Sequence, residues 1–79
     1  MFPILKMFEM CTQAYPNSAN AWDSYAEVNV HLGNNDLAIK YYQKALEILP
    51  VDSTINDNFR ELIRNSATGA LERLQQEEN

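Results

Sequence analysis

The chain has 79 residues and a net charge of -5, and its composition of 46% hydrophobic and 22% charged residues fits one small folded domain better than a disordered tail. Six Lys and Arg residues are scattered among eleven Asp and Glu residues, which argues against nucleic-acid binding, because that binding relies on clustered cations. No apolar run approaches the roughly 20 residues that span a bilayer, so we expect a soluble protein that makes no use of a membrane, and the sequence does not indicate its compartment.

Hydrophobic periodicity predicts four helices and no strand, with breaks at Pro16, Gly33 and Pro50. The first helix is expected from about Pro3 to Ala14, because proline suits the first turn of a helix, where a backbone N–H has no partner. Its apolar residues cover roughly 220° of the helix circumference, whereas a one-sided surface helix needs a stripe of about 100°. One neighbouring helix cannot cover that width.

The second helix is expected to follow Asn17 or Ser18, since either side chain can accept a hydrogen bond from the free amides of a first turn. Gly33 ends it. Its inward face has spacings of three and four residues and consists of Trp22, Tyr25, Ala26 and Asn29.

The third helix is expected to open at Asn35 or Asp36 and to stop before Pro50, whose ring is incompatible with a helix interior. Its apolar face repeats at helical spacing and consists of Ala38, Tyr42, Ala45, Leu46 and Leu49. Small residues on these two helices suit a close crossing, and aromatic rings suit the wedges between neighbouring helix pairs.

The last segment keeps one helical phase from Ile55 to Leu74. The alternative is a break between Ser66 and Gly69. A glycine inside a helix costs only about 1 kcal/mol relative to alanine, which a packed apolar stripe can offset, so we expect one long helix.

A period of 34 residues is visible along the chain. It aligns three pairs of residues: Pro16 with Pro50, Phe8 with Tyr42, and Cys11 with Ala45. Such a period is typical of a helical solenoid. The segment 19–52 resembles a tetratricopeptide repeat, whose pattern of Trp, Leu-Gly, Tyr, Ala, Phe, Ala and Pro is supplied here by Trp22, Tyr25, Ala26, Asn29, Ala38, Tyr42, Ala45 and Pro50. Only Asn29 departs clearly, because it stands where the family has tyrosine.

The resemblance implies an all-α fold, a tetratricopeptide-type helix-turn-helix solenoid of about four helices in a single domain. We expect a half repeat over 1–16, a full repeat over 17–52 and a C-terminal capping helix over 53–79. It also implies a protein–protein interaction module, because in tetratricopeptide proteins the first helix of each pair lines a concave groove that binds peptides.

Acidic residues recur at the 34-residue offset, as Asp23 and Glu27 and then as Asp57 and Glu61. We expect these four residues, with Asn20, to line one wall of a partner-binding groove. The resulting negative potential predicts a partner that is basic or polar rather than acidic. The alternative interpretation is that the acids form only the solvated face of amphipathic helices.

Self-association is predicted for the first helix. Three of its residues are expected to face the next helix: Ile4, Phe8 and Cys11. Three others are assigned to an uncovered flank: Leu5, Met7 and Met10. An uncovered apolar flank favours a two-fold homodimer, since closed symmetric pairs are the commonest oligomers. The alternative is that preceding sequence covers this flank in a longer chain.

No catalytic, metal or cofactor site is predicted, because the chain has one His and one Cys and neither has a partner at a functional spacing. His31 is interpreted as a residue near a helix end. Cys11 is interpreted as a small core residue, since it aligns with Ala45.

A second hypothesis makes this chain the non-catalytic tail of a bacterial serine hydrolase. The segment 15–27 resembles the repeat that closes some penicillin-recognising enzymes and some esterases. No serine here is followed three residues later by lysine and no Gly-x-Ser-x-Gly motif occurs, so the active site would lie upstream. The reading frame before the Met1 codon would separate the two hypotheses.

Overall fold

The computed structural model describes residues 4–77, and within this range the chain is helical without any strand. The elements in chain order are α1 (Ile4–Ala14), α2 (Ala19–His31), α3 (Asn35–Ile48), the short 3-10 helix η1 (Leu49–Val51) and α4 (Asp57–Glu77). The expected helix start at Pro3 and the last two residues of the expected capping helix lie outside the described range. The predicted all-α fold of tetratricopeptide-like helical hairpins is confirmed.

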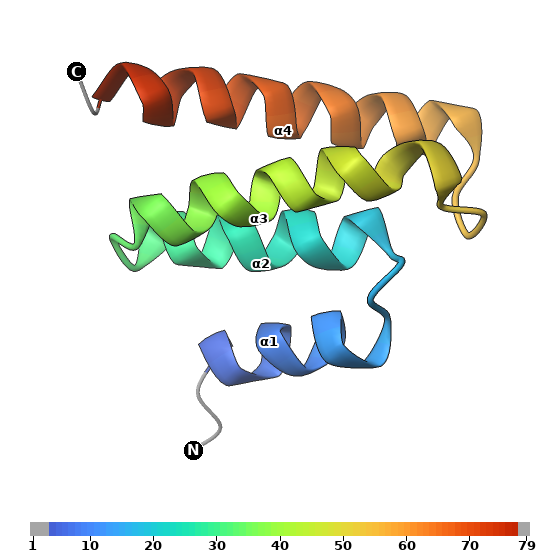
Figure 1. Ribbon diagram of the computed structural model, residues 1–79, viewed down its shortest axis with the longest axis horizontal. Helices are drawn as coiled ribbons and strands as arrows, with labels where there is room; N and C mark the ends of the chain where they lie inside the picture. The colour runs from blue at the N-terminus through green and yellow to red at the C-terminus, as the bar shows by residue number, and fades with distance from the viewer. Residues whose placement is uncertain (1–3, 78–79) are drawn as a thin grey trace.

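The helices form a thin slab whose Cα atoms extend 34 × 33 × 15 Å. Helices α2 and α3 make an antiparallel hairpin, with α4 along one side and α1 along the other (Figure 1). The central helix α2 packs against α1, α3 and α4, whereas α1 packs extensively on α2 alone. This difference in the number of neighbours decides which side chains are buried.

The ends of α2 and α3 follow the expected local chemistry. Ser18 rather than Asn17 caps α2, because its Oγ accepts a hydrogen bond from the Ala21 amide at 3.3 Å. Gly33 has φ of +81°, a left-handed conformation that suits a residue without a Cβ at the end of a helix. Helix α3 then begins at Asn35.

Alanines line the contact between the helices. Ala26, Ala38 and Ala45 are all fully buried, as their small size predicted. One core cluster joins α2, α3 and α4 and consists of Ala26, Ala38, Tyr42, Ala67, Ala70 and Leu74. The second cluster lies where η1 meets the helices and consists of Ala19, Ile48, Leu49 and Ile63.

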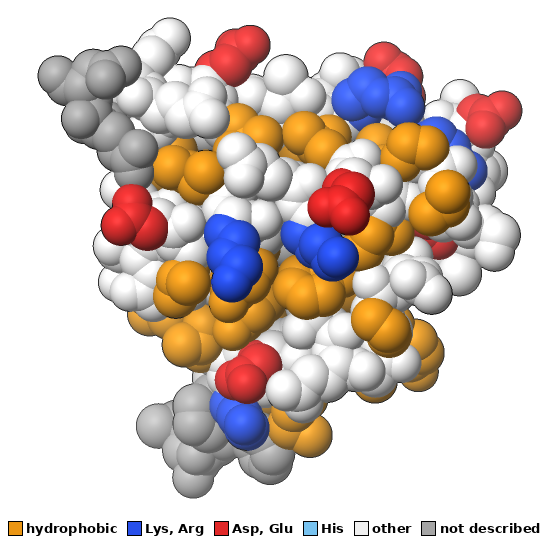
Figure 2. Space-filling model, viewed as in Figure 1, with side chains coloured by type: hydrophobic (Ala, Val, Ile, Leu, Met, Phe, Trp, Pro, Cys, Tyr) orange, Lys and Arg blue, Asp and Glu red, His pale blue; other side chains and the backbone are white. Residues whose placement is uncertain are grey.

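The aromatic rings of α2 and α3 lie at the edge of this core. Tyr25 stacks on Tyr41 with ring centroids 4.4 Å apart, and Trp22 is tilted against Tyr41 at 5.8 Å. Trp22 is only half-buried, and its indole N–H donates to the carbonyl of Pro16 at 2.8 Å. On the face of the molecule where α3 is in front, hydrophobic side chains form two bands, one on each side of α3, with Lys and Arg between them (Figure 2).

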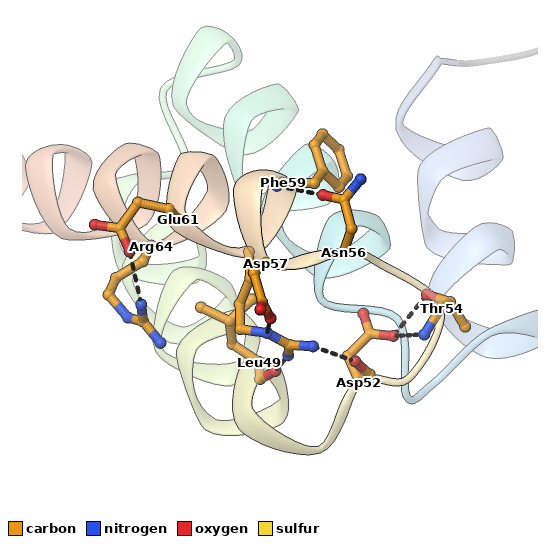
Figure 3. Close-up of polar contacts among 9 residues, drawn as sticks. Leu49, Asp52, Thr54, Asn56, Asp57, Phe59, Glu61 and Arg64 are labelled. Atoms are coloured by element: carbon orange, nitrogen blue, oxygen red, sulfur yellow. Dashed lines mark hydrogen bonds and ion pairs between the residues drawn. The ribbon is translucent and has the colours of Figure 1, made fainter.

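Helix α4 is unbroken from Asp57 to Glu77, so the prediction of one long helix through Gly69 is confirmed. It begins after Ile55, because Asn56 caps its first turn and accepts the Phe59 amide at 2.8 Å (Figure 3). Not all of its predicted apolar stripe is covered. Leu62 is 63% exposed.

A buried carboxylate, Asp52, links the start of α2 to the turn before α4, a feature that the sequence did not reveal. Figure 3 shows its contacts on the side of that turn. Asp52 accepts the Ala19 amide at 2.9 Å and both the amide and the hydroxyl of Thr54, at 2.9 and 2.6 Å. Arg60 donates to the carbonyls of Leu49 and Asp52. Burial alone would raise the pKa of Asp52, but these hydrogen bonds and the Arg60 charge hold that pKa below its usual value. We call this group the Asp52 joint.

Asn29, the one clear departure from the repeat pattern, is fully buried with its amide satisfied. Its Nδ2 donates to the Tyr25 carbonyl at 2.8 Å, and its Oδ1 accepts from Asn34 at 3.2 Å. The backbone amide of Asn34 also bonds the Asn29 carbonyl at 2.8 Å. Asn29 therefore ties the end of α2 to the turn that follows it.

The predicted inner face of α1 is partly wrong. Ile4 is 64% exposed and Cys11 is exposed, so Cys11 is not the core residue that its alignment with Ala45 suggested. Instead Thr12 is buried, while Leu5 and Phe8 are half-buried. Because α2 is the main neighbour of α1, only one stripe of α1 can be covered, and Leu5, Phe8 and Thr12 occupy that stripe.

Candidate functional site

Although α2 is the most enclosed helix, one of its faces remains open. Asn20, Glu27 and His31 are exposed and lie seven and four residues apart, a spacing that puts them in one row along the helix. Asp23 and Ser24 flank this row and are half-buried. We call these five residues the α2 strip.

A hollow lies at each end of the α2 strip. The first encloses about 230 Å³ between α1 and α2, and its lining includes Phe8, Cys11, Tyr15, Asn20 and Ser24. The second encloses about 290 Å³ where α2, α3 and α4 meet, and its polar lining consists of Glu27, His31, Tyr42, Ser66 and Arg73. The strip therefore connects two depressions on opposite sides of α2.

The structure does not bring the four predicted acids together in one wall. Asp23 lies against α4 at Ser66, whose hydroxyl is 3.4 Å from its Oδ1. Asp57 and Glu61 precede Ser66 by nine and five residues, which places them about 180° and 140° around the helix from it. The reason is the register of α4 along α2, because Asp23 contacts a residue 43 positions later and not one 34 positions later.

Ion pairs confirm the separation. Asp57 lies 3.9 Å from Arg60 and Glu61 lies 3.0 Å from Arg64, both on α4 itself (Figure 3). By contrast, among residues 4–77 the only basic group within ion-pair distance of Glu27 is His31, whose Nε2 lies 3.9 Å from Oε1. Of the predicted groove residues, the structure thus groups Asn20, Asp23 and Glu27.

The pKa of Asp23 in the α2 strip and the pKa of the neighbouring Tyr42 phenol are both raised. Burial, and then the charge of Glu27, raise the pKa of Asp23 to about 6, and the Ser66 hydroxyl opposes this rise. Burial, and then the charges of Asp23 and Glu27, raise the pKa of Tyr42 to about 12, against the opposing charge of Arg73. Tyr42 therefore lies within electrostatic range of these charges, and it lines the same hollow as Glu27 and Arg73.

The predicted self-association residues divide between two sides of α1. Met7 and Met10 are 50% and 46% exposed. They line a shallow apolar hollow of about 560 Å³ with Cys11, Ala14 and Tyr15. Leu5 is half-buried and does not line that hollow. We call the five lining residues the α1 flank.

Residues 4–77 contain no group of three or more His, Cys, Asp or Glu side chains placed to hold a metal ion. Over the same range no helix combines the length and apolarity that crossing a bilayer requires. Ser66 and Arg73 were not predicted as site residues, since their place beside α2 follows from the 43-residue register of α4 and not from the repeat period.

Two curated relatives share part of this sequence. Over 69 residues the chain is 30% identical to cleavage stimulation factor subunit 77 of Arabidopsis thaliana, a match that covers 87% of this chain and 9% of that protein. Over 55 residues it is 36% identical to tetratricopeptide repeat protein 33 of Homo sapiens, covering 70% of this chain and 21% of that protein. The matches thus span less than a quarter of either relative's length.

No protein-family model matches the chain, and no solved structure matches it. The relatives support a tetratricopeptide-like helical repeat of the protein-interaction kind. Neither is bacterial or named as a hydrolase, so the hypothesis of a bacterial serine-hydrolase tail has no support.

Proposed function

We propose that this chain is a non-catalytic protein-interaction module whose α2 strip binds a segment of a partner protein. In this proposal residues 1–16 act as a half repeat, 17–52 as a full repeat and 53–79 as a capping helix. The observation that carries it is the open polar face of an otherwise enclosed helix, with a hollow at each end. A peptide crossing α2 obliquely could place one side chain in each hollow.

The preferred partner segment is basic or polar. Glu27 lines the second hollow, Asp23 lies one turn before it on α2 and contacts Ser66 of the same lining, and Asn20 offers an amide at the first hollow. Carboxylates in such positions attract Lys and Arg and repel acidic peptides. Asp57 and Glu61 are paired with arginines on α4, so they contribute only to the overall negative field.

Selection from a random peptide display library, with the 79-residue chain as bait, tests this function. The double variant Asn20→Lys/Glu27→Lys changes two exposed residues of the strip. We expect it to weaken the selected peptides by roughly tenfold or more at low salt, because attraction becomes repulsion. The matched control Asn65→Lys/Glu72→Lys makes the same two changes at exposed positions of α4 and should retain binding. Equal losses in both variants, or no loss in either, would contradict a site on the α2 strip.

We further propose that the chain forms a two-fold homodimer through the α1 flank. Met7 and Met10 leave an apolar surface on a helix that has one main neighbour, and a second copy of α1 would cover it. Leu5, being half-buried, supports this surface from the side of α2.

Sedimentation equilibrium over a hundredfold concentration range tests the dimer. We expect the wild-type chain to dimerise and Met7→Lys/Met10→Lys to stay monomeric with unchanged helicity. The control Gln43→Lys/Asn65→Lys adds the same charge at exposed polar positions of α3 and α4, away from α1, and should dimerise. A monomeric wild type, or a methionine variant that dimerises as wild type does, would refute this interface.

A further inference from the structure

The second hollow, where α2, α3 and α4 meet, has the walls of a side-chain pocket. Its apolar wall consists of Val30, Ala70 and Leu74, and its polar rim carries Glu27 and Ser66. Its volume of about 290 Å³ exceeds that of any single amino-acid side chain, so it can hold one together with water.

Tyr42 supplies a polar group that the fold does not use. The residue is 4% exposed and lines the hollow. Among residues 4–77 its hydroxyl makes no hydrogen bond, and because no buried side-chain oxygen or nitrogen in that range lacks a partner, the hydroxyl oxygen itself is open to solvent at the hollow. Its phenol is near enough to Asp23 and Glu27 to respond to their charges. The hydroxyl of a largely buried tyrosine is thus available to a ligand in a hollow that Glu27 also lines.

These features select among ligand types. A carboxylate would meet the charge of Glu27 in the lining and that of Asp23 one turn away, and an apolar side chain would leave the Tyr42 hydroxyl without a partner. A lysine side chain suits both the apolar wall and the polar groups of the hollow. Its methylene stem can lie on the apolar wall while its ammonium, a compact charge with three donors, reaches the carboxylate and the phenol oxygen.

We propose that this hollow binds the side chain of a lysine from the partner segment, with its ammonium held by the Glu27 carboxylate and the Tyr42 hydroxyl. The inference deepens the proposed function of the α2 strip and rests on it. Arg73 lines the same hollow and competes with the lysine as a cation, and it can leave because its side chain is long and exposed. His31, also in the lining, competes only when protonated.

Nuclear magnetic resonance titration of the ¹⁵N-labelled 79-residue chain tests this pocket. The probe is the peptide acetyl-Gly-Ser-Lys-Ser-Gly-amide, and its control replaces lysine by norleucine, which has a similar stem without the ammonium. We expect saturable shifts at the amides of Val30, Ser66 and Ala70 with the lysine peptide only. A single exposed pocket implies a dissociation constant on the order of 1 to 10 mM.

Three variants sharpen the test. Glu27→Gln should weaken the lysine peptide about three- to fivefold, the range of one solvent-accessible ion pair. Tyr42→Phe removes only the hydroxyl and should weaken it by about twofold while the fold is kept. Arg73→Gln should strengthen binding, because a competing cation is lost. A merely structural role for these residues would not move the affinity in opposite directions.

The outcomes separate this inference from the function on which it rests. Equal shifts with the lysine and norleucine peptides, or unchanged affinity in all three variants, would overturn the lysine pocket. Shifts confined to the first hollow would overturn it as well and leave the α2 strip as a binding surface. Display-selected peptides that depend on Asn20 and Glu27 but contain no lysine would also overturn the pocket alone. No shift at any residue up to 20 mM peptide, with no display-selected peptide, would overturn both.

Discussion

Helices α1 and α3 carry matching residues 34 positions apart, yet the fold buries them very differently. Tyr42 is buried and Ala45 is fully buried on α3, whereas their counterparts Phe8 and Cys11 on α1 are half-buried and exposed. The cause is the number of neighbours, since α3 lies against both α2 and α4 while α1 packs extensively on α2 alone. A position in a repeat therefore predicts where a side chain points, and the presence of the next helix decides whether it is buried.

The largest expected effect is a difference between equivalent aromatic residues. Tyr42→Ala should lower the free energy of unfolding by about 3 to 5 kcal/mol, because it leaves a cavity in the main core cluster. Phe8→Ala should cost only about 1 kcal/mol, because Phe8 is half in solvent. Urea denaturation followed by circular dichroism measures both. Similar losses in the two variants would mean that α1 is as firmly enclosed as α3.

Enclosure has opposite consequences for two carboxylates, because only one of them has enough donors. The Asp52 carboxylate accepts three hydrogen bonds near the Arg60 guanidinium, whereas Asp23 has the Ser66 hydroxyl and faces Glu27. Hydrogen bonds to a carboxylate favour its charged form, and burial near another acid disfavours it. The two acids should therefore change the stability of the chain in opposite directions with pH.

Asp52→Ala should cost about 2 to 3 kcal/mol at pH 7, because the buried Ala19 amide loses its acceptor. Asp52 has a lowered pKa in the folded chain, so its contribution is complete above the unfolded value of 3.8. It is lost as the pH falls through the lower folded value. Urea denaturation at pH 7 and at pH 2.5 should show a smaller difference from wild type at the lower pH. An equal loss of unfolding free energy at the two pH values would contradict a charged carboxylate at Asp52.

Asp23→Asn should have a smaller and opposite effect. The pKa of Asp23 is raised from 3.8 to about 6, so its ionisation costs stability above pH 6, and the cost vanishes below about pH 4. The variant should exceed wild type by about 1 kcal/mol at pH 7.5, a value discounted for the partial exposure of Asp23. At pH 3.5 the two should match. A variant that is less stable than wild type at pH 7.5 would refute the unfavourable burial of this charge.

Much of the fold follows from local signals in the sequence. Helix boundaries at Ser18, Gly33 and Pro50 depend on backbone chemistry within a few residues, and small alanines indicate close crossings whatever the overall arrangement. The long α4 was predictable because its apolar phase continues through Gly69. These features need no knowledge of distant contacts.

The candidate site was less predictable, because it depends on how α4 is shifted along α2. The 34-residue period suggested that Asp57 and Glu61 lie beside Asp23 and Glu27, but the fold places Ser66 there. The Asp52 joint was also not predictable, since an aspartate that follows a helix is typical of a solvated turn. Its role depends on the Ala19 amide, which is 33 residues away in the sequence. Cys11 was predicted to be buried because it aligns with Ala45, but it is exposed. That prediction assumed a further helix packed against α1, and no such helix is among the described elements.

The smallest energetic change gives the most direct test of how α1 and α3 differ. Cys11 is exposed in the native chain, so its thiol should react with a disulfide reagent at nearly the rate measured in urea. The variant Cys11→Ser/Ala45→Cys moves the thiol 34 residues along the chain to the fully buried Ala45 position. One added sulfur there should cost about 1 kcal/mol, the low end of the range for adding a group to a packed core, so the chain stays folded while the reagent reacts only when α3 opens. We expect labelling to slow by at least about tenfold relative to wild type, with equal rates after unfolding. Comparable labelling rates in the two native proteins would show that the thiol at position 45 is as accessible as the thiol of Cys11. That result would contradict the difference in burial between α1 and α3.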